Sequence, residues 1–277
     1  MKNLKLAAVC LSCLTMTGCS ALNFSVEGLI NAPKLTSEQS EIHQALIESV
    51  GSNITLKYPK NGEYRSAYVI ANIDDEPTDE AMVFYEYTSN GSEEDGLRVN
   101  ILDKDEKGKW YSVKELAGAG TDIDQVIISP MGSNNQTDVF VGYQNLTNDE
   151  KTMEIYSYTD GDFKRVALDT YSVLEPLDIN NDGYIELITI QRSTNNDTGA
   201  VTAKASMLNM KNNEITRGEN VDMCDNVTSY VSSKTGMLDS GRRAIFIDGL
   251  TADGKLQTEI IYYRYSGLQN PMQLRSE

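Results

Sequence analysis

A short polar loop followed by an apolar strand occurs four times along this chain, and this repeat constrains the fold more than any other feature. The loops begin at residues 72, 130, 178 and 235, so successive copies lie 58, 48 and 57 residues apart. A period of this length is typical of repeat architectures, in which each copy forms one supersecondary unit that stacks on its neighbours. The sequence therefore predicts an array of similar units.

Each copy also contains a similar set of predicted strands, which are short apolar runs bounded by turn residues. The predicted strands are residues 64–71, 81–87, 96–102 and 109–116 in the first copy, 123–128, 139–143, 153–158 and 163–168 in the second, 172–177, 187–191, 201–209 and 215–222 in the third, and 226–232, 244–248, 257–265 and 272–275 in the fourth. Hairpin turns are expected at residues 103–108 and 160–162. Four strands in a unit of about fifty residues are typical of a β-propeller blade. We therefore predict an all-β fold, a propeller-like array of about four four-stranded blades; a β-sandwich whose loops are similar by chance is the alternative.

The third loop, residues 178–186, has the arrangement of oxygen atoms that a hard cation prefers. Oxygen-bearing side chains occupy its first, third, fifth and ninth positions, and Gly183 at the sixth position permits a sharp turn. The predicted ligands are Asp178, Asn180, Asp182, the main-chain carbonyl of Tyr184, and Glu186. We therefore predict one structural Ca²⁺ site in this loop, with an Asx-rich surface turn that binds no metal as the alternative.

The other three loops keep fewer of these oxygen atoms. The first loop, residues 72–80, retains Asn72, Asp74, Glu76 and Glu80. Its sixth position is Pro77, where the turn needs glycine. The second and fourth loops, residues 130–138 and 235–243, have lost most of their acidic residues and are expected only to turn the chain. A metal site in a single copy favours a structural role over catalysis.

The strand, acidic loop and following strand of the third copy resemble the FG-GAP or VCBS-type repeat, which is found in bacterial surface proteins and in the integrin α-subunit propeller. The resemblance covers roughly residues 60–270 and implies that the loop 178–186 binds Ca²⁺ through its first, third, fifth, seventh and ninth positions. Glu186 stands where aspartate is commoner in the family. Propellers of this family usually have about seven blades, and four are the lower limit for closure. The chain is therefore expected to be either a small propeller or, the reading we favour, a truncated product with an open array.

The N-terminus has the features of an export signal. Lys2 and Lys5 precede an apolar run, residues 6–16, that is too short to span a bilayer. Residues 16–19, Met-Thr-Gly-Cys, resemble the lipobox of bacterial lipoproteins. The resemblance implies cleavage after residue 18 and lipidation (palmitate) of Cys19, which would anchor the chain to the extracytoplasmic face of the cell membrane. An ordinary signal peptide that is cleaved nearby is the alternative.

These features divide the chain into four predicted parts. They are a lipoprotein signal peptide (residues 1–18), a tether (19–35), a helix (36–51) and the propeller-like repeat domain (54–277). The helix is predicted from a capping box that joins Thr36 and Gln39, and from Gly51 at its end. Its apolar stripe consists of Ile42, Leu46, Ile47 and Val50.

The charge of the chain limits its partners. Removal of residues 1–18, which contain two lysines and no acid, changes the formal net charge from −17 to −19. Nucleic acids and anionic lipid surfaces repel a protein with such a charge. We therefore expect no nucleic-acid partner, whereas cation binding or high solubility suits the composition.

Residues with catalytic potential lack the neighbours that catalysis needs. Cys224 is the one cysteine left beyond Cys19, so no disulfide framework is expected, and no histidine lies near it in the sequence to activate the thiol. His43, the only histidine, lies on the predicted helix and is expected to pack or to face solvent. Lys234-Thr235-Gly236 matches one β-lactamase element, but the chain has no S-x-x-K nucleophile motif, so we predict a turn there.

Together these observations predict a lipid-anchored extracytoplasmic protein with a non-enzymatic surface-binding or scaffold role. Its partners are the membrane, through the lipid on Cys19, and a protein or glycan ligand. No catalytic residue is predicted. The alternative function is a carbohydrate-active propeller enzyme that uses acidic residues at its hub, because a chain with 41 acidic residues always contains carboxylate pairs.

Overall fold

The computed structural model describes residues 35–74, 76–88, 96–130, 137–145, 150–194, 201–211 and 214–271. The chain divides into two compact units, Met1–Ser40 and Glu41–Glu277. The predicted signal peptide, Cys19 and all but the last residue of the predicted tether lie outside the described residues. Within the described ranges, no helix has the length and apolar character needed to cross a membrane.

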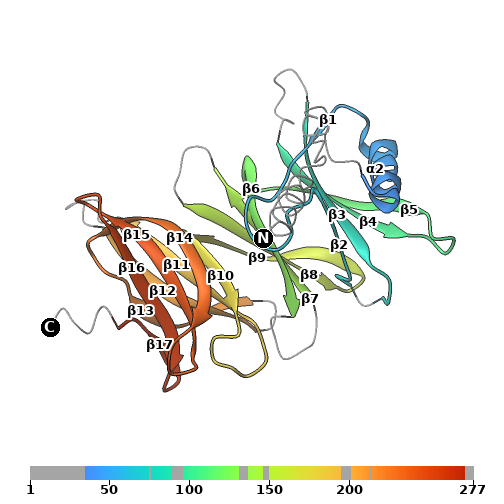
Figure 1. Ribbon diagram of the computed structural model, residues 1–277. Helices are drawn as coiled ribbons and strands as arrows, with labels where there is room; N and C mark the ends of the chain where they lie inside the picture. Colours follow the sequence, from blue (N-terminus) through green and yellow to red (C-terminus); the bar gives the residue numbers. More distant parts are fainter. Residues whose placement is uncertain are drawn as a thin grey trace, which may run out of the picture. The chain divides into compact units, whose positions relative to one another are not determined.

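Four antiparallel sheets, which we call blades 1–4, make up most of the second unit and confirm the predicted all-β, propeller-like array. Figure 1 shows them in chain order, from the cyan strands of blade 1 to the red strands of blade 4. Blade 1 comprises β1 (Ile54–Leu56), β2 (Tyr68–Ala71), β3 (Glu80–Tyr87), β4 (Leu97–Lys104) and β5 (Trp110–Ala117). Blade 2 comprises β6 (Asp122–Pro130), β7 (Thr137–Gln144), β8 (Lys151–Thr159) and β9 (Asp162–Tyr171). Blade 3 comprises β10 (Val173–Leu177), β11 (Glu186–Thr194), β12 (Val201–Lys211) and β13 (Glu214–Asp222). Blade 4 comprises β14 (Val227–Met237), β15 (Arg243–Thr251), β16 (Leu256–Arg264) and β17 (Gly267–Gln269).

The structure corrects one prediction in the fourth copy. Strand β14 continues beyond its predicted end to Met237, so residues 234–236, predicted as a turn, lie inside a strand. The predicted last strand, residues 272–275, lies outside the described residues. Among the described residues, the short strand β17 pairs with β16. The turn before β17 places Tyr265 and Ser266 at φ angles of 53° and 75°. Neither residue type signals such a turn, because glycine and asparagine are the usual residues at positive φ.

The helix α2 (Ser37–Val50) forms as predicted. The Thr36 hydroxyl accepts a hydrogen bond from the Gln39 main-chain nitrogen at 3.1 Å, and the Gln39 side chain accepts one from the Thr36 nitrogen at 3.1 Å. Gly51 ends the helix at a φ of 86°, a conformation that glycine adopts without strain. In the second unit, Ile42 and Leu46 are buried against blade 1.

Neighbouring blades pack face to face through separate buried clusters. Phe84 of blade 1 belongs to the same cluster as Val141 of blade 2. Phe140, the residue before Val141 in β7, belongs to the cluster shared with blade 3, because successive side chains point to opposite faces of a strand. Blades 3 and 4 share a further cluster that contains Ile188 and Ile247. The strands β3, β7 and β11 are therefore buried on both faces. This burial explains why they are nearly continuous apolar runs in the sequence.

The first strand of blade 1 is split, and the segment between its halves reaches blade 2. Strands β1 and β2 lie end to end along one edge of β3, and the segment 57–67 connects them. The main-chain nitrogens of Lys60 and Asn61 donate hydrogen bonds to the carbonyls of Ile123 and Asp124, at 3.1 Å and 2.7 Å. The segment 57–67 thus covers part of the free edge of β6.

Candidate functional site

The predicted calcium loop joins β10 to β11 and is tightly folded. Asn181 and Gly183 both have positive φ angles, 68° and 95°, as the sharp turn requires. The Tyr184 side chain points into solvent, with 53% of its surface exposed, and its main-chain nitrogen donates a hydrogen bond to Asp182 at 2.9 Å. The loop backbone therefore has the compact form that the sequence predicted.

The structure brings together the four side chains that were predicted as ligands. The Asp178 carboxylate accepts hydrogen bonds from the main-chain nitrogens of Asp182 and Gly183, at 3.0 Å and 3.2 Å. The Asn180 side-chain amide donates to the carboxylates of Asp182 and Glu186, at 2.9 Å and 2.7 Å. The Asn180 amide thus joins two of the three carboxylates, and the main chain of the same loop binds the third, Asp178. Their chemistry fits a hard cation such as Ca²⁺, which takes carboxylate and carbonyl oxygens.

Arg243 supplies a positive charge to this loop from blade 4. Its guanidinium lies 2.9 Å from the Asp178 carboxylate and donates to the Asp178 carbonyl at 3.0 Å. Arg243 is the ninth residue of the fourth loop, where the third loop has Glu186. Over the described ranges, no group of three or more His, Cys, Asp or Glu side chains is arranged to hold a metal ion. The Ca²⁺ site therefore stays a prediction.

The first and third loops share one hydrogen bond that explains their glutamates. The Glu80 carboxylate accepts a bond from the Ile73 main-chain nitrogen at 2.8 Å, and the Glu186 carboxylate accepts one from Ile179 at 3.0 Å. In both loops the ninth residue binds the second, and both isoleucines are buried. The glutamate at position nine therefore closes each of these two loops through a main-chain hydrogen bond.

The Glu80 carboxyl group is buried in surroundings that disfavour its charged form. Its side chain is 2% exposed, and one carboxylate oxygen has no hydrogen-bond partner among the described residues. Burial raises the pKa of Glu80 to about 7, the Ile73 hydrogen bond opposes the rise, and the charges of Asp74 and Asp103 add to it. The equivalent Glu186 also has a raised pKa, for the same main reason.

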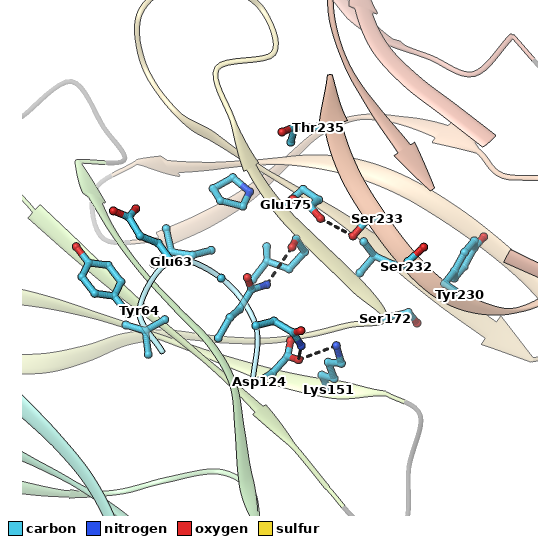
Figure 2. A pocket seen from close by; sticks show the side chains of 18 of the residues that line it. Glu63, Tyr64, Asp124, Lys151, Ser172, Glu175, Tyr230, Ser232, Ser233 and Thr235 are labelled. Carbon is cyan, nitrogen blue, oxygen red and sulfur yellow. Dashed lines mark hydrogen bonds and ion pairs between the residues drawn. The ribbon is translucent and has the colours of Figure 1, made fainter. Parts of the chain in front are cut away.

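A cavity of about 660 Å³ lies among the first strands of blades 2, 3 and 4 (Figure 2). It is lined by residues from the stretches 61–64, 124–128, 172–176 and 230–235, together with Lys151 and Ile185. The walls thus come from the segment 57–67 and from strands β6, β10 and β14. No sequence pattern predicted this site, because its residues come from parts of the chain that are far apart.

Side chains rather than main-chain ladders join the first strands around the cavity. The Gln125 side chain of β6 donates to the Leu174 carbonyl of β10 at 2.9 Å. The Ser233 hydroxyl of β14 donates to the Glu175 carboxylate of β10 (Figure 2). Pro176 of β10 has no N–H group to donate to a neighbouring strand, and proline within a sheet is typically found on a free edge. Single side-chain contacts therefore bridge these strand edges, and the cavity lies among them.

Asp124 has its charge fully compensated within the cavity wall. The residue is 1% exposed and sits at a bulge in β6. Its carboxylate accepts hydrogen bonds from the side chains of Asn61 (2.8 Å), Lys151 (2.9 Å) and Tyr171 (2.7 Å). Two neutral donors and one cation therefore satisfy this buried carboxylate, as buried charges require.

Glu175 lies on the same cavity but is much less compensated. Among the described residues, the hydroxyl of Ser233 is the one group that donates a hydrogen bond to its carboxylate. Burial raises the pKa of Glu175, and the Ser233 hydrogen bond opposes the rise. Asp124 and Glu175 thus differ sharply in their surroundings.

Cys224 and His43 have environments that agree with the packing roles expected for them. Burial, aided by the charge of Glu259, raises the pKa of the Cys224 thiol to about 12, which is opposite to the activation of a nucleophile. The His43 ring nitrogen Nδ1 lies 2.8 Å from the Tyr68 hydroxyl, and the two rings meet edge to face.

Comparison with known proteins adds no name to this site. No family model and no curated protein matches the chain. The loop 178–186 and the cavity are therefore the features that bear on function.

The buried carboxylate of Glu80 predicts a pH-dependent stability. An unfolded glutamate has a pKa near 4.5 and the folded one a pKa of about 7, so the charged form opposes folding increasingly between those values. Glu80→Gln keeps an oxygen for Ile73 and removes the charge. We expect it to raise the free energy of unfolding by about 1–2 kcal/mol at pH 8 and to change it little at pH 4. Urea denaturation in EDTA at several pH values measures this.

The matched control is Glu76→Gln, which makes the same charge change at an exposed position of the same loop. It should leave the pH profile unchanged. A Glu80→Gln variant whose stability falls at pH 8, or shifts equally at every pH, would contradict the assignment.

Proposed function

We propose that this chain is a lipid-anchored binding module on the extracytoplasmic face of a bacterial cell membrane, with a non-enzymatic role. The observation that supports binding most strongly is the cavity of about 660 Å³, which polar side chains enter from four separate stretches of the chain. Its volume lies in the range of small-ligand sites, roughly 300–1,000 Å³. The lipid anchor rests on the lipobox-like residues 16–19.

The repeat architecture supports a relation to FG-GAP or VCBS-like proteins. The first and third loops, residues 72–80 and 178–186, use the same hydrogen bond between their ninth and second residues. A shared hydrogen bond at equivalent positions is what descent from one repeated unit predicts. The relation is part of the proposal, and it favours a surface-binding or scaffold role over catalysis.

A carbohydrate-active enzyme is the second candidate, and one observation favours it. Glu175 lines a cavity and has a raised pKa, as a general acid in glycoside hydrolysis does. The reaction also needs a second free carboxylate. The buried carboxylate of Asp124 in the cavity wall already accepts hydrogen bonds from Asn61, Lys151 and Tyr171. Glu63, an exposed acid in the cavity lining, is therefore the carboxylate that would have to act as the partner of Glu175 in hydrolysis.

A panel of neutral and charged glycans and small polar molecules, applied to the purified protein, separates the two candidates. We expect saturable binding without product formation. Calorimetry measures the binding, and chromatography of the incubated glycans detects products. Turnover of any glycan would contradict the non-enzymatic role, and failure of every compound to bind would contradict the binding role of the cavity.

We further propose that one Ca²⁺ ion stabilises the loop 178–186. Asp178, Asn180, Asp182, the Tyr184 carbonyl and Glu186 would hold the ion, and the ion would supply positive charge to three converging carboxylates. In the described structure, the Asn180 amide and the Arg243 guanidinium moderate their repulsion. Binding to the folded state alone stabilises it by mass action.

The Ca²⁺ proposal predicts a shift in the melting temperature. Millimolar Ca²⁺ should raise the melting temperature by several degrees relative to EDTA, since a ligand at about 100 times its Kd adds about 2.7 kcal/mol. Asp182→Ala should abolish the shift. Asp239→Ala, which removes an exposed acid from the fourth loop, should preserve it. Equal shifts in wild type and Asp182→Ala, or no shift at all, would show that the loop binds no calcium.

The lipid anchor predicts the location of the protein in cells. Cys19→Ala removes the thiol that would be acylated, so the variant should move from the membrane fraction to the soluble fraction. Fractionation followed by immunoblotting measures this. Cys224→Ala is the control and should stay with the membrane; unchanged partitioning of Cys19→Ala would refute the anchor.

A further inference from the structure

The charged residues that line the cavity do not balance one another. They are Glu63, Asp124, Lys151 and Glu175. Lys151 lies 2.9 Å from Asp124, so these two charges cancel within the wall. Two carboxylates remain, and the described lining holds no second lysine or arginine. A ligand that fills the cavity therefore meets a net negative charge.

Glu175 is the one of these two carboxylates that is largely withdrawn from water. It lies on β10 between Leu174 and Pro176, with the Ser233 hydroxyl as its donor. A single hydroxyl compensates a carboxylate poorly, and a buried charge without a counter-charge destabilises a fold. Its raised pKa has the same origin. A cation that entered the cavity would supply the missing partner.

Two aromatic side chains add to the preference for a cation. Tyr64 and Tyr230 line the cavity on either side of Glu175 in the view of Figure 2. The faces of aromatic rings attract ammonium groups, and most strongly where water is excluded. The hydroxyl oxygen of Tyr230 is buried, so the contact that Tyr230 offers to a ligand in the cavity is its ring.

The field of the whole protein favours the same ligand. The formal net charge of the chain is −17. Clefts in a protein of one dominant charge concentrate that field and attract ions of the opposite sign. Neutral and anionic ligands gain nothing from this field.

We propose that the cavity binds a small organic cation through a primary ammonium group, with the Glu175 carboxylate as its counter-charge and Tyr230 as a second contact. This inference rests on the proposed binding function and names the class of ligand. It does not depend on Ca²⁺ or on the lipid anchor.

Calorimetric titration with 1,4-diaminobutane and with butane-1,4-diol tests the proposal, since the two probes have equal length and differ in charge. The purified full-length protein should bind the diamine at least about tenfold more tightly than the diol. Raising NaCl from about 0.05 M to 0.5 M should weaken the binding of the diamine and leave that of the diol unchanged.

Glu175→Gln should weaken the binding of the diamine at least about tenfold, because it keeps the Ser233 hydrogen bond and removes the charge. Glu106→Gln makes the same change of net charge in the exposed turn between β4 and β5, and it should bind the diamine like the wild type. The probe pair on the wild type remains decisive if Glu175→Gln does not fold.

Equal affinity for the two probes, or an unchanged affinity of folded Glu175→Gln for the diamine, would overturn the proposal. Binding of a neutral glycan without binding of the diamine would also overturn it, while the proposed binding function would stand. If neither probe nor any glycan binds, both the inference and the binding function are wrong.

Discussion

The buried carboxylate of Asp124 is the point at which three parts of the chain meet, and the cavity depends on it. Asn61 brings the segment 57–67 to this carboxylate, Lys151 comes from the start of β8, and Tyr171 comes from the end of β9. The Tyr171 hydroxyl reaches it across Gly142, where a Cβ atom would lie only 2.0 Å away. Glycine is therefore required in β7 for a hydrogen bond between the two edge strands of blade 2. The same bond is one of the three that satisfy the buried Asp124 carboxylate in the cavity wall.

The ninth position of each loop shows how one site can take different roles in a repeated fold. In blades 1 and 3 it is a glutamate that binds the second residue of its own loop, as Glu80 and Glu186 do. In blade 2, Asp138 instead accepts a hydrogen bond from Ser157 of the neighbouring strand β8. In blade 4 it is Arg243, which contacts Asp178 in the loop of blade 3. The position lies at the beginning of β3, β7, β11 or β15, so the backbone is repeated while the side-chain chemistry changes.

The sequence predicted what local patterns determine. The central strands are buried on both faces and are therefore apolar runs, and the turn at Asp160 and Gly161, with φ angles of 54° and 73°, has the residues that such a hairpin needs. Short strands that form only through pairing, such as β1 and β17, gave no usable signal. The contact of Arg243 with Asp178 and the cavity wall at Glu175 also escaped prediction, because each joins residues that only the tertiary fold brings together. For the calcium loop, local pattern predicted the compact turn and the convergence of side chains, while the metal itself stays a prediction.

The most direct test of this account is hydrogen exchange at the main-chain amides of Lys60 and Asn61. These amides donate to the carbonyls of Ile123 and Asp124, and the Asp124 side chain should hold them there. In Asp124→Asn, where the charge that binds Lys151 is lost, we predict that both amides exchange at least about tenfold faster, beyond any change in the central strands of blade 1. Exchange rates at these two amides that match the wild type, or that rise only as much as those of β3, would contradict the claim that Asp124 holds the cavity wall together.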